Sequence, residues 1–227
     1  EINKAKKRFV ITRPTLSDLD DLVNLNHTAW TEEALHASKE DIQARIQTCP
    51  KNIFVVRLND EQGKIIAAIY FLRKNYRSIE EISKEDLQWE VLIGNGTLNE
   101  PEGEIAIAYD LSVLEEYRGK ELLIASELIA YLAGHLEKQG ILVLYTATTL
   151  QDFRVKKKVK GHPAYKLHTR TYDDIKPAAT LVHLGRGYRK GENKSLDIAF
   201  FSYPLNPSQA NGQGRTTSSP VAMISQP

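Results

Sequence analysis

This sequence of 227 residues contains few of the features that mark a disulfide-stabilised, membrane-spanning or polyanion-binding protein. Its single cysteine, Cys49, excludes an internal disulfide and a multi-cysteine zinc site, and we expect a reducing, cytoplasmic location. The 30 basic and 29 acidic residues leave a formal net charge of +1, which predicts no overall attraction to nucleic acid or to a membrane. No apolar run approaches the roughly 20 residues that span a bilayer. The first residues, EINKAKKRF, are charged and lack an apolar core, so we expect no signal peptide.

The composition is typical of a globular domain with a buried core, since 41% of the residues are hydrophobic and 26% are charged. The six histidines are not spaced with carboxylates as metal ligands are, so we predict no metal site. The chain lacks an initiator methionine, and we expect it to be part of a longer protein. From Asn206 onward the residues are mostly Ser, Gly, Gln, Thr and Pro, with no acidic residue. We therefore predict one domain over 1–205 and a flexible linker over 206–227, although a frayed terminus would have the same composition.

Strand-like and helix-like segments alternate along the predicted domain. We expect strands over 9–12, 52–58, 64–72, 104–113, 141–150 and 195–203, and helices starting at Thr15 or Ser17 and at Ser38, and covering 120–139 and 173–186. The stretch 78–103 is acidic and we treat it as an insertion. The resulting order, β-α-α-β-β-β-α-β-α-β, predicts a single domain with a mixed α/β sheet.

A candidate phosphate site lies between the strand over 104–113 and the helix over 120–139. A strand that feeds a helix through a short loop directs free backbone N–H groups and the positive end of the helix at one point. Arg118 and Lys120 add positive charge there, and Gly119 permits a ligand to approach closely. A solvated helix start would have the same residues, so this pattern by itself leaves both interpretations open.

The element order and the segment LSVLEEYRGKELL (111–123) resemble the acetyl-CoA-dependent N-acetyltransferase superfamily, known as the GNAT fold. That superfamily carries Arg/Gln-x-x-Gly-x-Gly/Ala in this loop, usually within V-x-P-x-Y-R-G-x-G-x-G. Val113, Tyr117, Arg118 and Gly119 match, whereas positions 115, 121 and 123 depart from the pattern as Glu, Glu and Leu. The resemblance implies a single-domain GNAT fold with a mixed, mostly antiparallel sheet flanked by helices. It also implies that coenzyme A, as acyl-CoA, contacts Leu111, Val113, Arg118, Gly119, Lys120, Leu122 and Leu123.

A second block of the superfamily, Asn-x-x-Ala-x-x-x-Tyr-x-x-x-Gly-Phe, resembles residues 176–188 of this chain. Ala179, Gly187 and Tyr188 match it, and His183 stands where the superfamily has the tyrosine that protonates the departing CoA. The pKa of a phenol is near about 10 and that of an imidazole near about 6.5, so the substitution implies different proton chemistry at this point. A histidine on an apolar helical stretch also fits a structural role.

Threonines end the strand over 141–150, and alternation places Thr149 and Thr148 on opposite faces. A threonine after the fifth strand and a histidine on the next helix resemble the GNAT-like loading domains of curacin-type modular polyketide synthases. The resemblance implies decarboxylation of malonyl-CoA to acetyl-CoA, with or without S-acetyl transfer to an acyl carrier protein, for polyketide chain initiation. On this hypothesis Thr149 and His183 are catalytic, Thr148 is the alternate, and the linker leads to a carrier-protein domain.

Other residues have both a functional and a structural interpretation. Trp30 forms a wall of the acyl pocket or packs in the core, and Arg186 guides the malonyl group or lies on the surface. Lysines at 156–158 and 160 form a basic patch that is solvated or docks an acidic carrier protein. Cys49 is a weak nucleophile candidate, because the sequence pairs no histidine with it.

Two other functions remain open at this point. An amine acetyltransferase would use acetyl-CoA and a base on the fourth strand, for which Asp110 is the candidate. A non-catalytic CoA-binding module would tolerate the departures in the loop. Both share the acyl-CoA partner with the decarboxylase hypothesis.

Overall fold

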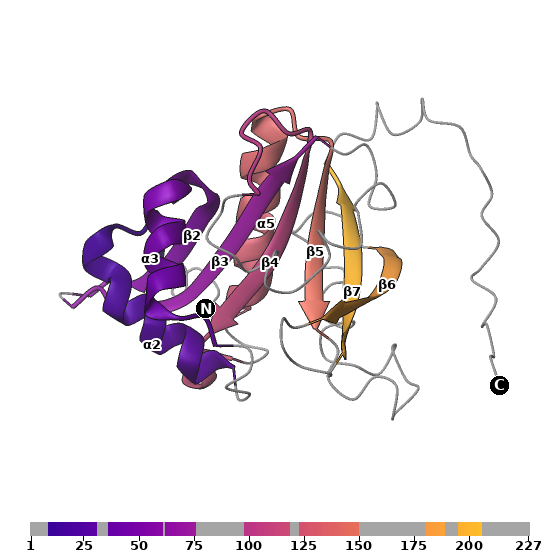
Figure 1. Ribbon diagram of the computed structural model, residues 1–227. Coiled ribbons are helices and arrows are strands. Elements are labelled where there is room, and N and C mark those ends of the chain that lie inside the picture. Colours follow the sequence, from indigo (N-terminus) through magenta and orange to yellow (C-terminus); the bar gives the residue numbers. More distant parts are fainter. Residues whose placement is uncertain are drawn as a thin grey trace, which may run out of the picture.

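A computed structural model describes residues 9–30, 36–60, 62–75, 98–118, 123–149, 180–188 and 195–205. These residues form one seven-stranded sheet with the order β1-β2-β3-β4-β5-β7-β6 (Figure 1). The strands are β1 (Phe9–Thr12), β2 (Ile53–Leu58), β3 (Ile65–Lys74), β4 (Ile105–Val113), β5 (Val143–Thr149), β6 (Thr180–Tyr188) and β7 (Ser195–Pro204). Among the described residues, only the β4–β5 pair is parallel, so the prediction of a mixed, mostly antiparallel sheet is confirmed.

In the described part of the chain, three α-helices flank the sheet, α2 (Leu19–Ala29), α3 (Lys39–Thr48) and α5 (Ile124–Lys138). The predicted cap of α3 is confirmed, because the Ser38 hydroxyl accepts a 3.0 Å hydrogen bond from the backbone N–H of Asp41. A short 3₁₀ turn, Leu16–Asp18, precedes α2. Helix α5 begins at Ile124 rather than at residue 120, and Gly140 follows its end with a left-handed φ of +76°.

The helices lie in two layers, with α2 and α3 over one face of the sheet and α5 over the other (Figure 1). Side chains of the neighbouring strands β2 and β3 show which helix covers each face of the sheet. The ring of Phe54 meets Tyr131 of α5 edge-on at 5.0 Å, whereas the ring of Tyr70 lies under the guanidinium of Arg45 from α3. Because β3 is covered on both sides, nearly all of its ten residues are buried.

The chain over 180–188 is a strand, so the prediction of a helix over 173–186 is wrong for 180–186; residues 173–179 lie outside the described part. β6 pairs with β7 from Thr180 to Tyr188 in an antiparallel ladder. Thr180, Val182, Gly185 and Gly187 are poor helix formers, and all but Val182, which lies at a register shift, have a pairing partner in β7. An apolar run with helical spacing was compatible with both structures, and pairing with β7 decided between them.

No helix in the described part of the chain is both long and apolar enough to cross a membrane. The predicted linker over 206–227 lies outside the described residues.

Candidate functional site

The parallel strands β4 and β5 pair for only part of their length. Ile105–Ala108 pair with Val143–Thr146, but β4 then continues to Val113 and β5 to Thr149 without pairing to each other. The two strands diverge beyond this ladder (Figure 1). We call this diverging part, 109–113 of β4 with 147–149 of β5, the fork.

A bulge in β4 turns two of its residues toward the fork. Tyr70 of β3 pairs with Asp110 and the next residue of β3 pairs with Ala108, so Tyr109 is the extra residue. The N–H of Leu114 donates to the carbonyl of Ile66 in β3 at 2.9 Å, so the backbone groups of Leu114 point toward β3. Since adjacent residues of a strand direct their N–H and C=O groups to opposite sides, those of Leu111 and Val113 point away from β3. These are the two β4 residues that the sequence predicts at CoA.

Arg118 connects the β4–α5 loop to the end of α2. Its Nε donates to the carbonyl of Val113 at 2.8 Å, and its Nη2 donates to the carbonyl of Ala29 at 2.7 Å. The guanidinium therefore positions the loop, and its contact with a pyrophosphate stays a prediction. The other residues predicted in this loop, Gly119, Lys120 and Leu122, lie outside the described residues.

Leu123 has a left-handed backbone, with φ of 47°, immediately before the first residue of α5. This is the position where the superfamily pattern has Gly or Ala. A side chain with a Cβ atom is strained in this conformation, whereas glycine adopts it freely. The loop therefore keeps the backbone path that favours glycine at this position, although the residue is leucine.

A buried polar network occupies the α2–α3 face of β4. Asp110 accepts hydrogen bonds from the Ser112 hydroxyl (2.8 Å) and the Asn26 amide (3.1 Å), and lies 3.7 Å from the Arg45 guanidinium. Ser112 in turn accepts a 3.1 Å hydrogen bond from the indole N–H of Trp30. Burial raises the pKa of Asp110, while Arg45 and the three hydrogen-bonding side chains Ser112, Trp30 and Asn26 oppose that shift. Sequence inspection missed Ser112 and Asn26; the signal was the polar spacing D-x-S within the apolar strand IAIAYDLSV.

This network changes the interpretation of Asp110 as a base. Its residue is 5% exposed and its carboxylate is directed at Asn26, Ser112 and Arg45 rather than at solvent. The phenol of neighbouring Tyr109 is no better placed to transfer a proton, because burial raises its pKa to about 12. The structure therefore gives Asp110 a structural role on β4.

Trp30 lies directly after α2 and is half-buried. Its indole packs against the core and is tied to β4 at Ser112, the residue between Leu111 and Val113. The structure thus brings Trp30 to the fork, as the hypothesis of an acyl-pocket wall requires. Its contact with the core agrees with the structural interpretation, and its contact with the acyl group stays a prediction.

Of the predicted pair, Thr149 ends the β5 arm of the fork, whereas His183 lies on β6, separated from β5 by β7. Thr149 pairs with Ile198 of β7, and His183 of β6 pairs with Phe200 of β7, which pairs with Ala147. Since neighbouring strands lie about 4.8 Å apart, the Cα atom of His183 is roughly 10 Å from that of Ala147. His183 is therefore not on a helix facing the strand, which corrects the basis on which it was aligned with the tyrosine.

Thr148 and Arg186 are placed by the same ladders. Thr148 pairs with Ala199, and Arg186 pairs with Asp197, one residue beyond the partner of Thr149. The basic patch at 156–158 and 160 lies outside the described residues.

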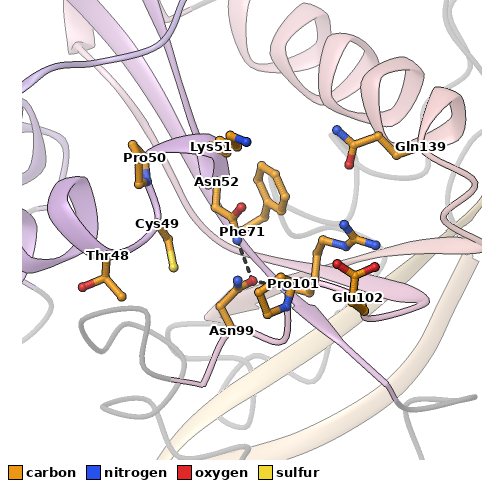
Figure 2. Close-up of a pocket in the computed structure, with 11 residues that line it drawn as sticks. Thr48, Cys49, Pro50, Lys51, Asn52, Phe71, Asn99, Pro101, Glu102 and Gln139 are labelled. Carbon is orange, nitrogen blue, oxygen red and sulfur yellow. Dashed lines mark hydrogen bonds between the residues drawn. The ribbon is translucent and has the colours of Figure 1, made fainter.

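A cavity of about 460 Å³ lies at the opposite end of β3 and β4 from the fork. Figure 2 shows its side chains, which come from the end of α3 and the 3₁₀ turn after it, from β3, from the turn before β4 and from Gln139 at the end of α5. Cys49 lines it, and burial raises the pKa of this thiol, which makes it a poor nucleophile. Among the described residues that the sequence predicts at the acyl-CoA site, none lines this cavity. Its lining includes Asn52, Phe71, Arg73, Asn99 and Gln139.

Comparison with solved structures identifies the architecture. The structure of the loading GNATL domain of CurA from Lyngbya majuscula aligns with a TM-score of 0.67 over 87% of this chain and 98% of that chain, at 19% identity. The chain has the GNAT fold. A GphF GNAT-like decarboxylase in complex with isobutyryl-CoA aligns over 87% of this chain and 100% of that chain, with a TM-score of 0.60 and 21% identity.

The GNAT fold is shared with amine acetyltransferases. An N-acetyltransferase from Staphylococcus aureus Mu50 covers 87% of this chain and 99% of that chain, with a TM-score of 0.51 and 16% identity. No family model and no curated protein matches the sequence. At these identities the GNAT neighbours establish the fold, and the function has to be argued from the fork.

Proposed function

We propose that this chain decarboxylates malonyl-CoA to acetyl-CoA and then passes the acetyl group to the thiol of an acyl carrier protein. The observation that carries the proposal is the position of Asp110. Its carboxylate is buried in hydrogen bonds and an ion pair, so the base expected on β4 for amine acetylation is engaged elsewhere. Decarboxylation needs no base to deprotonate an acceptor amine.

The described activities of two structural neighbours with the GNAT fold support the proposal. One is a loading domain and one is a GNAT-like decarboxylase bound to isobutyryl-CoA. By analogy, we place CoA along the fork, with its pantetheine at Leu111 and Val113 and its pyrophosphate at the start of α5. The loop residues that would hold the pyrophosphate are Arg118, Gly119, Lys120, Leu122 and Leu123.

In the reaction that we propose, the C–C bond to the malonyl carboxylate breaks and its electron pair moves into the thioester, which becomes an enolate. Carbon dioxide leaves, and a proton added to the α-carbon gives acetyl-CoA. A backbone N–H of β4 turned into the fork, at Leu111 or Val113, would stabilise the enolate oxygen. A strong cationic clamp on the carboxylate would instead stabilise the ground state and slow the reaction.

We assign the acyl end of the substrate to Thr149 and His183. Thr149 ends β5 beyond the last β4 pair, and its hydroxyl would orient the malonyl carboxylate. His183 would donate the proton to the α-carbon. Because its strand is two ladders from β5, the imidazole would act on the substrate rather than through direct contact with Thr149.

The test of this function is incubation with malonyl-CoA in the absence of any amine, with CO₂ and acetyl-CoA as the products measured. Release of both supports the proposal. Consumption of acetyl-CoA only when an amine is supplied would establish amine acetylation instead, and binding without turnover would establish a CoA-binding module. Addition of a carrier protein then tests the transfer step by its mass increase.

The residue assignments are tested by Thr149→Val and His183→Ala. Each variant should lose about 10²-fold or more in kcat while the dissociation constant for CoA stays unchanged, because both act at the acyl end. Thr48→Val on α3 and His135→Gln on α5 are matched controls far from the fork and should keep wild-type rates. Undiminished decarboxylation in Thr149→Val or in His183→Ala removes that residue from the mechanism.

A further inference from the structure

We propose that Ser112 is a positioning residue, which holds the indole of Trp30 at the acyl end of the fork through a hydrogen-bond relay to Asp110. The inference rests on the proposed function for its catalytic consequence. The relay itself is defined by geometry within the described residues. It links a strand that faces the substrate to the aromatic side chain that we expect to wall the acyl group.

The direction of each hydrogen bond in the relay is determined by chemistry. The Asp110 carboxylate can only accept, so the Ser112 hydroxyl donates its single proton to Asp110 Oδ1 in a 2.8 Å hydrogen bond. The indole N–H of Trp30 can only donate, and it donates to the remaining lone pair of the Ser112 oxygen at 3.1 Å. Ser112 is 2% exposed, so water does not replace these partners.

The other carboxylate oxygen of Asp110 anchors the chain at Ala37, and it does so through Asn26. Asn26 donates its amide to Asp110 Oδ2 at 3.1 Å and accepts from the backbone N–H of Ala37 at 2.8 Å. One carboxylate therefore anchors Trp30, both through Ser112 and by a hydrogen bond from the Trp30 side chain itself, and anchors Ala37 through Asn26. Arg45, 3.7 Å away, favours the ionised form that accepts both bonds.

The position of Ser112 on β4 gives the relay its functional meaning. Ser112 lies between Leu111 and Val113, whose backbone groups point into the fork. The relay therefore sets the indole relative to the groups that we assign to the thioester. Small displacements of a positioning group can cost about 10²-fold in rate, so loss of the hydroxyl should lower kcat and leave the affinity for CoA unchanged.

The experiment uses the two tryptophans of the sequence, Trp30 and Trp89, which give two indole N–H signals in a ¹H–¹⁵N spectrum. Trp30→Phe assigns the signal of Trp30. In Ser112→Ala we expect hydrogen-exchange protection of that N–H to fall tenfold or more. We also expect kcat for malonyl-CoA to fall at least tenfold, with the CoA dissociation constant within twofold of wild type. Ser112→Thr, which keeps the hydroxyl, should restore both properties, and Ser202→Ala on β7 is the matched control.

Retention of the protection in Ser112→Ala would overturn the relay, and loss of protection with kcat within twofold of wild type would overturn its positioning role. Failure of the proposed function is a separate result, namely no turnover of malonyl-CoA by the wild-type chain. In that case the Trp30 indole signal decides. A shift on adding malonyl-CoA that Ser112→Ala abolishes supports the inference, and no shift in the wild type overturns it.

Discussion

At the scale of single residues, the most informative features are those that break a local preference. Leu123 adopts a left-handed backbone that favours glycine, and Asp110 is a carboxylate in a strand that is otherwise almost entirely apolar. Asp110 lies on the β4 arm of the fork, and Leu123 ends the segment that joins β4 to α5. Departures from local rules concentrate at functional sites because the fold compensates for their cost elsewhere.

Replacement of Leu123 by glycine should stabilise the protein. A left-handed residue with a Cβ atom costs about 1–2 kcal/mol, and glycine is also a better residue than leucine before the first turn of a helix. Loss of the half-buried leucine side chain offsets part of this, so we expect a gain of about 1 kcal/mol in the free energy of unfolding by urea titration. The opposite change, Gly140→Ala at φ of +76°, should destabilise by a similar amount. Equal or lower stability of Leu123→Gly contradicts the expectation.

At the scale of elements, the end of β1 is joined to β2 and α5 by a polar and aromatic cluster. The Arg13 guanidinium lies 3.8 Å from the centre of the Phe54 ring and donates to His135 Nε2 at 3.1 Å. The Gln139 amide donates to the same nitrogen at 2.8 Å. Since both partners are donors, Nε2 carries no proton and the ring is neutral, with its proton on Nδ1. Protonation of His135 would break both bonds.

This cluster predicts a pH dependence of stability. Burial, and then the charges of Arg13 and Lys138, lower the pKa of His135. The contribution of the neutral ring is therefore complete above the unfolded pKa of about 6.5 and is lost as the pH falls through the lower folded pKa. Urea unfolding from pH 8 to 5 should show a steeper loss of stability in the wild type than in His135→Gln. Parallel curves for the two proteins would contradict this.

The element scale also shows where prediction from sequence works. The strands β1–β5 and β7 and the helices α2, α3 and α5 were predictable within a few residues, because caps, turns and hydrophobic periodicity are local signals. The segment over 180–188 was not, since Thr-Leu-Val-His-Leu has apolar spacing that fits either element and only the ladder with β7 selects the strand. The same misassignment placed His183 on the wrong kind of element.

At the scale of the whole molecule, the pair of Arg45 and Asp110 joins the α2–α3 layer to the sheet. Both side chains are almost fully buried, with residue exposures of 1% and 5%. Two rings, Tyr70 and Tyr109, lie 5.3 and 5.6 Å from the Arg45 guanidinium carbon and enclose it. Removal of one charge from such a pair leaves the other buried and uncompensated.

We therefore expect Asp110→Asn to destabilise the fold strongly, by about 3–5 kcal/mol in urea unfolding. Asn retains the size of the side chain, so the effect reports the charge rather than a cavity. Asp20→Asn is the control, because that carboxylate pairs with Lys39 on the surface, where an ion pair contributes about 1 kcal/mol or less. Equal stability of the two variants would show that the buried charge does not contribute.

The sequence alone determined the order of most elements and the residue types available at the β4–α5 loop, because hydrophobic periodicity, capping and turn residues act between near neighbours in the chain. The tertiary structure decided which of those residues meet. The divergence of β4 from β5, the turning of Leu111 and Val113 into the fork, and the burial of Asp110 with Ser112, Asn26 and Arg45 all depend on partners far away in sequence. Such contacts leave only weak local signals in the sequence. An aspartate that is buried in an ion pair and an aspartate that acts as a solvent-exposed base are the same residue type, and only the packing of the surrounding layers distinguishes them.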